Sequence, residues 1–332
     1  MKKLSIIIVN YKTSQLIVQL LNSIQQLDQY EIIVVDNDSP DNSAVIVQSA
    51  FPQIKFIPLS YNAGFARANN EGIRIARSEI VLLLNPDTIE IDNAIGKCVD
   101  RFSQEDYVAC GVQLLNVDGS PQISGNYAMK GGLNYLLPLP YVGAFLKWLG
   151  NLTNVSKPNV PNASDKVEVD WINGAFLMVK KNAIEKAGLL DEEFFLYAEE
   201  AEWCSRLKRN GKLCIYGDLK VTHLQGEAAN DAFNSEGKGY YNLYDKKGLQ
   251  IMLSNFVRIR KQFGVGWFLI DLLIYTLTVP VFLVIGFFHR LITFKNPFGH
   301  FTSCMKFTKN IFALWSYSGT IISRKPHFYK VL

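Results

Sequence analysis

The chain has 332 residues, enough for one large domain or two ordinary ones, and its formal net charge of +4 is unevenly spread. Residues 240–332 contain 12 Lys/Arg and 2 Asp/Glu, a net charge of +10, whereas residues 1–239 contain 22 and 28, a net charge of −6. The basic residues of the C-terminal part flank apolar stretches, which favours anionic lipid as the partner and argues against nucleic acid. Five scattered cysteines without zinc-like spacing favour a reducing compartment.

Residues 1–115 alternate between apolar runs and segments with helical spacing. The runs expected to form strands are 4–9, 31–35, 54–57, 80–84 and 107–112. The segments expected to form helices are 14–26, 42–50, 65–76 and 92–102. Continuously apolar strands separated by helices predict an α/β fold with a parallel sheet that is covered on both faces.

Polar residues stand at the ends of three of these predicted strands. Asn10 and Tyr11 follow the first strand, Asp36 ends the second, and Asn85-Pro86-Asp87 follows the fourth. Asn-Pro-Asp is ordinary turn chemistry, but ligands of such sheets bind at the carboxyl ends of the strands. Three polar tips along one edge therefore favour a binding site, and an acid such as Asp36 can bind a nucleotide's base or ribose. No GxGxxG follows the first strand, which argues against a dinucleotide site.

The third predicted helix begins with a glycine and contains two asparagines. Asn62 and Gly64 stand at its start, where a glycine can let the backbone approach a ligand. Asn69, Asn70 and Gly72 are poor helix formers inside it. Tight packing of the helix on a strand would explain Gly72 but not two asparagines, so we expect a binding role for Asn70.

The next part of the chain is less regular. Residues 116–166 are rich in Gly, Pro and Asn and predict a long, partly mobile excursion, and residues 167–181 predict one further buried strand. His223 ends a later strand. A diphosphate-bound Mg²⁺ or Mn²⁺ takes one or two protein ligands, which Asp87 and His223 could supply. The alternative for a lone histidine is a hydrogen-bonded structural role.

Three acids crowd the start of a predicted helix after the aromatic segment FFLY. They are Glu199, Glu200 and Glu202. Acids stabilise helix N-termini by ~0.3–1 kcal/mol each, and Glu202 stands four residues before Arg206, so a structural role is one alternative. The other is that one partly desolvated carboxylate is tuned as a general base.

Seven segments in chain order carry a resemblance to a known family: SIIIVNY, VVDNDS, NAGFARANNEGI, LLLNPDT, WINGAFLMV, FFLYAEEAEWCSRLKRNGK and VTHLQG. From residue 4 to about residue 226 the chain resembles the family 2 glycosyltransferases of the GT-A fold. The resemblance is greatest to the rhamnosyltransferase-like branch, which builds bacterial surface polysaccharides such as O-antigen. It implies a Rossmann-like, mostly parallel sheet flanked by helices in a catalytic domain, residues 1–239. The nucleotide-binding half would cover about 1–115 and the acceptor half about 116–239.

The resemblance also implies roles for single residues. The nucleotide would be bound by Asp36, at its base, and by Asn10, Tyr11, Asn62, Gly64, Asn69, Asn70 and Asn85. The donor or acceptor pocket would be lined by Trp171, Gly174, Ala175, Glu199 and Glu202. Asp87 and His223 would hold Mn²⁺ or Mg²⁺, and Glu200 would be the base. Because Glu199-Glu200 replaces the usual Glu-Asp pair, the choice of base among the neighbouring acids stays open.

By the same resemblance, the chain would be an inverting, metal-dependent glycosyltransferase. The expected donor is dTDP-L-rhamnose and the expected acceptor is a polyprenyl-diphosphate-linked saccharide. One alternative is a non-catalytic protein that binds sugar nucleotides or glycans. Another is a processive polysaccharide synthase, which would carry a Gln-x-x-Arg-Trp motif and several spanning helices that the sequence does not display.

The basic, apolar region 240–332 is expected to associate with a membrane through residues 267–288, which hold one charge, Asp271, and one proline, Pro280. As one helix this stretch would be about 33 Å long at ~1.5 Å per residue, enough to span a core of ~30 Å. Basic residues flank both sides about equally, and Pro280 is expected to divide the stretch into halves too short to span. We therefore predict a bent or re-entrant monotopic tail on the cytoplasmic face of the bacterial inner membrane, with a spanning helix as the alternative.

Overall fold

The computed structural model describes residues 2–331 except 129, 153–158, 161, 225–232, 234 and 236–241. The chain forms two compact units. The first comprises Met1–Tyr127, Asn159–Phe195 and Glu199–Ala228, and the second comprises Ala128–Pro158, Leu196–Ala198 and Ala229–Leu332. The expected domain boundary at residues 239–240 lies outside the described residues. Residues 128 and 130–152, which the sequence assigned to the acceptor half, lie in the second unit.

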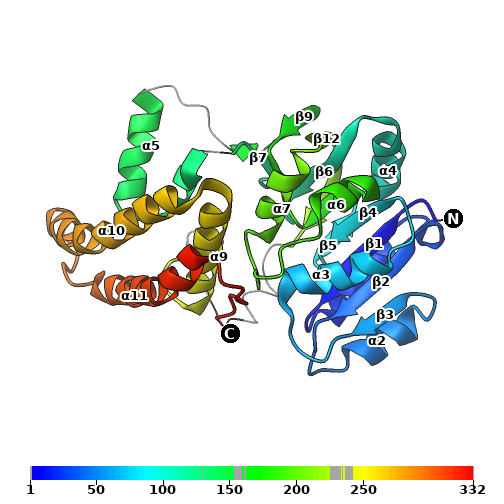
Figure 1. The fold of residues 1–332 in the computed structure, drawn as a ribbon, viewed down its shortest axis with the longest axis horizontal. Coiled ribbons are helices and arrows are strands. Elements are labelled where there is room, and N and C mark those ends of the chain that lie inside the picture. The colour runs from blue at the N-terminus through cyan, green and yellow to red at the C-terminus, as the bar shows by residue number, and fades with distance from the viewer. Residues whose placement is uncertain are drawn as a thin grey trace. The chain divides into compact units, whose positions relative to one another are not determined.

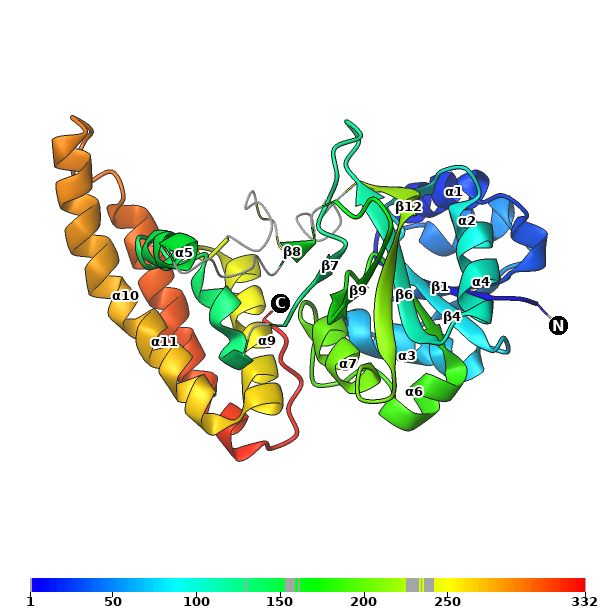
Figure 2. The same cartoon turned by 90° about the horizontal axis from the view of Figure 1, so that it is seen from above.

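The first unit is built on a large mixed sheet (Figures 1 and 2). Its order is β3-β2-β1-β4-β11-β6-β12-β5, with β9 paired to β12, and a small second sheet has the order β10-β7-β8. The strands are β1 (Ser5–Asn10), β2 (Glu31–Asp36), β3 (Lys55–Pro58), β4 (Ile80–Leu84), β5 (Thr88–Glu90), β6 (Tyr107–Leu115), β7 (Gly125–Asn126), β8 (Asn159–Val160), β9 (Lys166–Val169), β10 (Trp171–Ile172), β11 (Phe176–Lys180) and β12 (Lys212–His223).

The predicted parallel sheet is confirmed for the first four strands. β1 pairs in parallel with β2 and β4, and β2 pairs in parallel with β3. β11 then runs antiparallel between β4 and β6, so these two strands are not neighbours. The single strand expected over residues 167–181 was wrong: β9, β10 and β11 take its place. The chain turns before β11 because the side chain of Asn173 accepts a hydrogen bond from the Ala175 N–H.

Helices cover both faces of this sheet (Figure 2). They are α1 (Ser14–Ser23), α2 (Ser43–Ala50), α3 (Gly64–Ile75), α4 (Ala94–Gln104), α6 (Lys181–Ala187) and α7 (Glu199–Leu207), with a short 3₁₀ helix, η1 (Leu27–Gln29). The four helices expected within residues 1–115 are confirmed to within a few residues. α3 packs closely on β1, since a Cβ on Gly72 would lie 2.5 Å from Cγ2 of Ile7.

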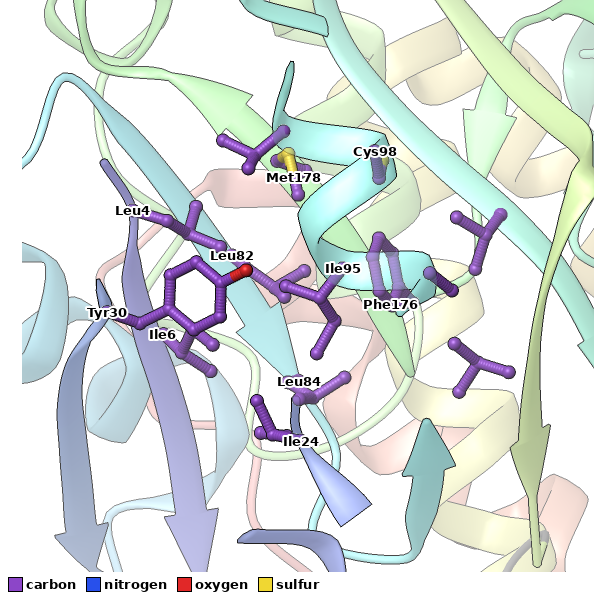
Figure 3. Packing of buried hydrophobic residues seen from close by; sticks show 14 of the residues in the cluster. Leu4, Ile6, Ile24, Tyr30, Leu82, Leu84, Ile95, Cys98, Phe176 and Met178 are labelled. Atoms are coloured by element: carbon purple, nitrogen blue, oxygen red, sulfur yellow. The ribbon is translucent and has the colours of Figure 1, made fainter. Parts of the chain in front are cut away.

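The core lies on the opposite face, between the sheet and helices α1 and α4. Figure 3 shows residues of this cluster, all of them buried: Leu4, Ile6, Ile24, Tyr30, Leu82, Leu84, Ile95, Cys98, Phe176 and Met178. Since successive side chains of a strand point to opposite faces, Ile6 and Ile8 enter this cluster while Ile7 faces α3. Packing on both faces holds the carboxyl ends of β1 and β4 in place, where the polar tips follow.

The second unit is helical. Its helices are η2 (Lys130–Leu136), α5 (Val142–Leu152), α9 (Lys246–Phe263), α10 (Val265–Ile292) and α11 (Phe301–Ser323). α9, α10 and α11 pack against one another, as Figure 2 shows. η2 lies against α9 and α10, where the hydroxyl of Tyr275 donates to the carbonyl of Tyr135 over 2.8 Å.

The expectation that Pro280 divides the apolar stretch was wrong. α10 continues through Pro280 from Val265 to Ile292. A proline removes one backbone donor, but packing of Phe268, Tyr275 and Phe282 inside the helical unit holds the helix on both sides of it. Among the described residues, α10 is the one helix long and apolar enough to cross a membrane, with a mean hydropathy of 2.4.

Candidate active site

Asn10 and Asp36 end two neighbouring parallel strands and are partners in the β1–β2 register. Nδ2 of Asn10 donates to Oδ1 of Asp36 over 2.6 Å, and the backbone N–H of Ser39 donates to Oδ2 over 3.1 Å. The other side-chain atom of Asn10, Oδ1, accepts from the N–H and the hydroxyl of Thr13. Asn10 is fully buried, so it supports Asp36 from inside the protein. Tyr11, the next residue, is half-buried.

Gly64 is required by a close approach within the protein. Its φ is +76°, and a Cβ there would lie 2.2 Å from the carbonyl oxygen of Phe195, to which the Phe65 N–H donates over 2.8 Å. Gly64 therefore allows the backbone of the segment before α7 to come close to the start of α3. The sequence suggested that a ligand would approach there. Asn62 caps the turn by accepting from the Gly64 N–H over 3.1 Å.

Asn37, which sequence reasoning did not single out, ties the end of β2 to the start of α3. Its Oδ1 accepts from the Ala63 N–H over 2.7 Å.

The two asparagines inside α3 bond to protein groups. Asn69 donates to the carbonyl of Phe65, one turn earlier. Asn70 donates to the carbonyl of Leu190 and accepts from its N–H, over 2.9 and 3.0 Å, and also donates to Glu192. Asn70 thus fixes the loop that leads to α7, which explains a polar residue in the middle of this helix.

Asp87 and His223, far apart in the chain, meet because β5 pairs with β12. Asn85 follows β4, and its N–H donates to the carbonyl of Ala175 over 3.0 Å. β5 then runs antiparallel to β12 with Thr88 opposite His223, and the Leu224 N–H donates to the carbonyl of Asp87. Nε2 of His223 lies 3.4 Å from Oδ1 of Asp87, and both side chains are buried.

A divalent cation fits this pair. Carboxylate oxygen and imidazole nitrogen are suitable ligands for Mn²⁺, and neighbouring ligand atoms of an octahedral ion with bonds of about 2.1 Å lie about 3 Å apart. The described part of the chain contains no group of three His, Cys, Asp or Glu that could hold a metal alone. Diphosphate oxygens and water would therefore complete the coordination of an ion held by Asp87 and His223.

The three acids of α7 have different surroundings, although all are buried. Glu202 is held by Arg206, whose Nε and Nη2 donate to its two carboxylate oxygens over 2.8 and 2.7 Å. Glu200 lies beside Gly174, where a Cβ would be 3.4 Å from its Cγ. The structure thus brings Glu200 and Gly174 together and pairs Glu202 with Arg206.

The backbone directly before these acids is strained. Tyr197 and Ala198 have φ values of 71° and 67°, a left-handed conformation that residues with a side chain rarely adopt. Each such residue costs on the order of 1–3 kcal/mol, and they cluster at functional sites. No glycine or asparagine marks the segment, so the sequence carried no signal of this strain.

Trp171 lies on β10, which packs on α7, and its indole N–H is buried. It is the register partner of Asn126 in the β10–β7 pair, so the two side chains share one face. Nε1 of Trp171 and Oδ1 of Asn126 are buried without a hydrogen-bond partner within the described ranges. A hydroxyl group or a water could satisfy such a donor and acceptor together. Asn126 was not among the residues expected from the sequence.

Comparison with known proteins shows what this chain is similar to. Residues 5–161 match the model of glycosyl transferase family 2. The low-salt glycan biosynthesis hexosyltransferase Agl10 of Haloferax volcanii is 31% identical over 212 residues, which are 62% of each chain. The N-acetylglucosaminyl-diphospho-decaprenol L-rhamnosyltransferase of Mycobacterium tuberculosis is 24% identical over 200 residues, 56% of this chain and 63% of the relative.

The fold has a counterpart among solved structures. A mannosyltransferase from Pyrobaculum calidifontis, solved with GDP-Man and Mn²⁺, superposes with a TM-score of 0.53 at 13% identity, covering 95% of this chain and 86% of that one. This likeness confirms the GT-A fold expected from the sequence. The match over residues 5–161, a little under half of the chain, confirms the resemblance to the family 2 glycosyltransferases as well.

Proposed function

We propose that this protein is an inverting, metal-dependent glycosyltransferase of glycan synthesis. The observation that carries the proposal is the pairing of Asp87 with His223 at the carboxyl edge of the sheet, 3.4 Å apart and buried. A carboxylate and an imidazole at this edge suit a cation that binds the diphosphate of a sugar nucleotide. Asp36, held by Asn10, would bind the base at the same edge.

In the proposed reaction, an acceptor hydroxyl oxygen attacks the anomeric carbon of the donor sugar. The bond from that carbon to the diphosphate oxygen breaks, and the nucleoside diphosphate leaves with the electron pair. Glu200 takes the proton of the attacking hydroxyl, a contribution typically worth ~10²–10⁴-fold. A bound divalent cation would stabilise the negative charge of the leaving diphosphate. Gly174 lies beside Glu200 and would line the sugar pocket next to the base.

For the substrates, we propose dTDP-L-rhamnose as donor and a polyprenyl-diphosphate-linked saccharide as acceptor. The support is the name of the mycobacterial relative, an L-rhamnosyltransferase that acts on a decaprenol-linked N-acetylglucosamine. The product would be a lipid-linked glycan in the synthesis of a surface polysaccharide.

A screen of sugar nucleotides tests this function. Thermal unfolding of the purified protein is measured with dTDP-, UDP- and GDP-sugars, each with Mn²⁺ and with a chelator. We expect one donor to raise the melting temperature in the presence of Mn²⁺ and to be hydrolysed slowly or transferred to a lipid-linked saccharide. Binding without hydrolysis or transfer would identify a non-catalytic sugar-nucleotide-binding protein instead.

We further propose that the second unit is monotopic and lies on the cytoplasmic face of the inner membrane. The outward face of α10 is apolar, and its exposed residues include Leu269, Ile270, Leu273, Leu277, Leu283, Val284 and Phe288. Its other face packs on α9 and α11. Because α11 exposes Lys306 and Lys309, the helical unit as a whole is unsuited to the bilayer core and suited to its interface.

Single cysteines test the topology in a variant without its native cysteines. Lys261→Cys lies before α10 and Lys309→Cys lies on α11. We expect an impermeant thiol reagent to label neither position in intact cells and both after lysis. Labelling of Lys309→Cys alone from outside would mean that α10 spans the membrane.

A further inference from the structure

Gln122 lies beside His223 and makes two kinds of contact with it. Its Nε2 donates to the backbone carbonyl of His223 over 2.7 Å and to Oδ1 of Asn116 over 2.8 Å. Its Oε1 lies 2.9 Å from Nδ1 of the His223 ring. Both residues are buried, with 7% of each exposed, so solvent competes little for these contacts.

The position of Gln122 follows from the turn after β6. β6 ends at Leu115, the Gly119 N–H donates to the carbonyl of Asn116, and the chain returns along β6 through the bridge between Leu115 and Pro121. β12 runs parallel to β6, with Thr222 opposite Leu115. The returning chain therefore places Gln122 next to the residue that ends β12.

These contacts fix the tautomer of His223. A backbone carbonyl only accepts hydrogen bonds, so the NH₂ group of Gln122 must face the carbonyl of His223, and its oxygen must face the ring. That oxygen also only accepts, so Nδ1 of His223 must carry a hydrogen. In the neutral imidazole, Nε2 then bears a lone pair, and this atom faces Oδ1 of Asp87.

We infer that Gln122 is a positioning residue that prepares His223 as a metal ligand. With its lone pair 3.4 Å from Oδ1 of Asp87, Nε2 is placed so that one cation could contact both groups. Partners on the second nitrogen of a metal-binding histidine set its tautomer and ring orientation, and their loss typically costs ~10–100-fold in metal affinity. The inference rests on the metal role proposed above, but it makes a separate claim about the ring that does not need the metal.

Two substitutions of Gln122 distinguish positioning from a merely structural role. Gln122→Glu keeps an acceptor for the Nδ1 hydrogen, whereas Gln122→Met has a similar length and no acceptor. The control is Gln113→Met, since Gln113 is a second buried glutamine of this region whose side chain bonds to the backbone of Leu114, Gln122 and Ala163. Like Gln122→Met, Gln113→Met removes buried hydrogen bonds, but it leaves the partner of the His223 ring in place.

The first measurement is the affinity for Mn²⁺ in the presence of dTDP, UDP or GDP, from the electron paramagnetic resonance signal of free Mn²⁺. We expect Gln122→Met to weaken Mn²⁺ binding by ~10–100-fold, and Gln122→Glu and Gln113→Met to stay within about threefold of the original protein. Equal losses in Gln122→Met and Gln113→Met would overturn the inference, because general loosening would then explain both.

The second measurement is the tautomer itself, from nitrogen NMR of protein with ¹⁵N-labelled histidine in the absence of metal at pH 8.5. We expect His223 to carry its hydrogen on Nδ1 in the original protein and in Gln122→Glu, and mainly on Nε2 in Gln122→Met. An Nε2 hydrogen in the original protein would overturn the inference. If instead the tautomer is as expected and no nucleotide supports Mn²⁺ binding, the metal-dependent function fails while the assignment of Gln122 to the ring stands.

Discussion

Arg206 holds the carboxylate of Glu202 from one turn further along α7, through Nε and Nη2 at 2.8 and 2.7 Å. The same guanidinium donates to the carbonyl of Ala187 over 2.6 Å, so the ion pair also ties α7 to the end of α6. Both oxygens of the Glu202 carboxylate are therefore engaged by one guanidinium. We therefore propose a structural role for Glu202, which leaves Glu199 and Glu200 as the candidates for the base.

Glu200→Gln keeps the shape of the side chain and removes its ability to take a proton. We expect turnover to fall at least ~100-fold with little change in donor affinity, because the loss falls on the proton transfer alone. The measurements are the initial rate of sugar transfer and the dissociation constant of the donor. Glu199→Gln is the matched variant, and a larger turnover loss there would reassign the base by one residue.

Glu202→Gln should behave in the opposite way. It weakens the bonds with Arg206 inside a largely buried pair, so we expect a loss of about 1–3 kcal/mol in stability. Turnover at a temperature where the variant is fully folded should stay within a few-fold of the original. Urea unfolding and a transfer assay at low temperature measure the two effects. A large turnover loss in a variant of unchanged stability would speak against the structural assignment.

Asp87→Asn tests the cation site at the end of β4. Asp87 stands in a turn and belongs to no strand, so we expect the fold to survive the substitution. Activity should fall below about 1%, since the amide replaces one of two protein ligands and removes its charge. Nucleoside-diphosphate binding, measured by calorimetry, should weaken more with Mn²⁺ than with a chelator present. If the original protein transfers sugar equally fast with Mn²⁺ and with a chelator, Asp87 is not a ligand of a catalytic metal.

Much of this candidate site could be predicted from the order of residues along the chain. The sequence places polar residues at the ends of predicted strands, and the carboxyl ends of parallel strands lie at the same edge of the sheet. Asn10 and Asp36 end β1 and β2, Asp87 follows β4, and continuously apolar runs identified those strands. The meeting of Asp87 with His223 could not be derived from local patterns. It depends on the pairing of β5 with β12, a non-local contact between strands with no marker in either sequence.

The asparagines of α3 illustrate the reverse case. The sequence showed that asparagines are unusual inside a helix. It could not show whether they bind a ligand or the backbone of another loop. Asn70 bonds to both backbone groups of Leu190, and only the tertiary structure reveals that loop. Gly64 is similar, since the need for a glycine was visible and the partner, the carbonyl of Phe195, was not.

Two glycines with nearly equal φ angles allow a direct test of this packing. Gly64 has φ +76° and Gly119 has φ +78°, but a Cβ on Gly119 would meet nothing within 4 Å. Gly119→Ala should therefore cost only the conformational penalty, about 1 kcal/mol. Gly64→Ala must also displace the Phe195 backbone, so we expect a clearly larger drop in melting temperature. We also expect a lower transfer rate, because a shift of Phe195 would move the acids at the start of α7. Equal drops in the two variants would contradict the close approach.

The second unit contains a buried acid that makes its stability depend on pH. Asp271 on α10 is fully buried, and neither carboxylate oxygen has a hydrogen-bond partner among the residues that the structure describes. Burial raises the pKa of the Asp271 carboxyl to about 7. The nearby Tyr275 does not compensate, since its hydroxyl donates to the carbonyl of Tyr135.

Asp271→Asn should remove this dependence. In the unfolded chain the carboxyl has a pKa of about 3.9, so between about pH 4 and pH 7 the folded state holds a proton that the unfolded state has lost. The free energy of unfolding therefore falls as the pH rises through this window, and the neutral amide escapes the loss. We expect the variant to melt slightly higher than the original at pH 5 in detergent, and this difference to be clearly larger at pH 8. The control is Asp118→Asn, an exposed acid whose pKa is lowered by bonds from Ser120, for which the difference should not grow with pH. A difference between Asp271→Asn and the original that stays constant from pH 5 to pH 8 would mean that Asp271 is charged in the folded protein.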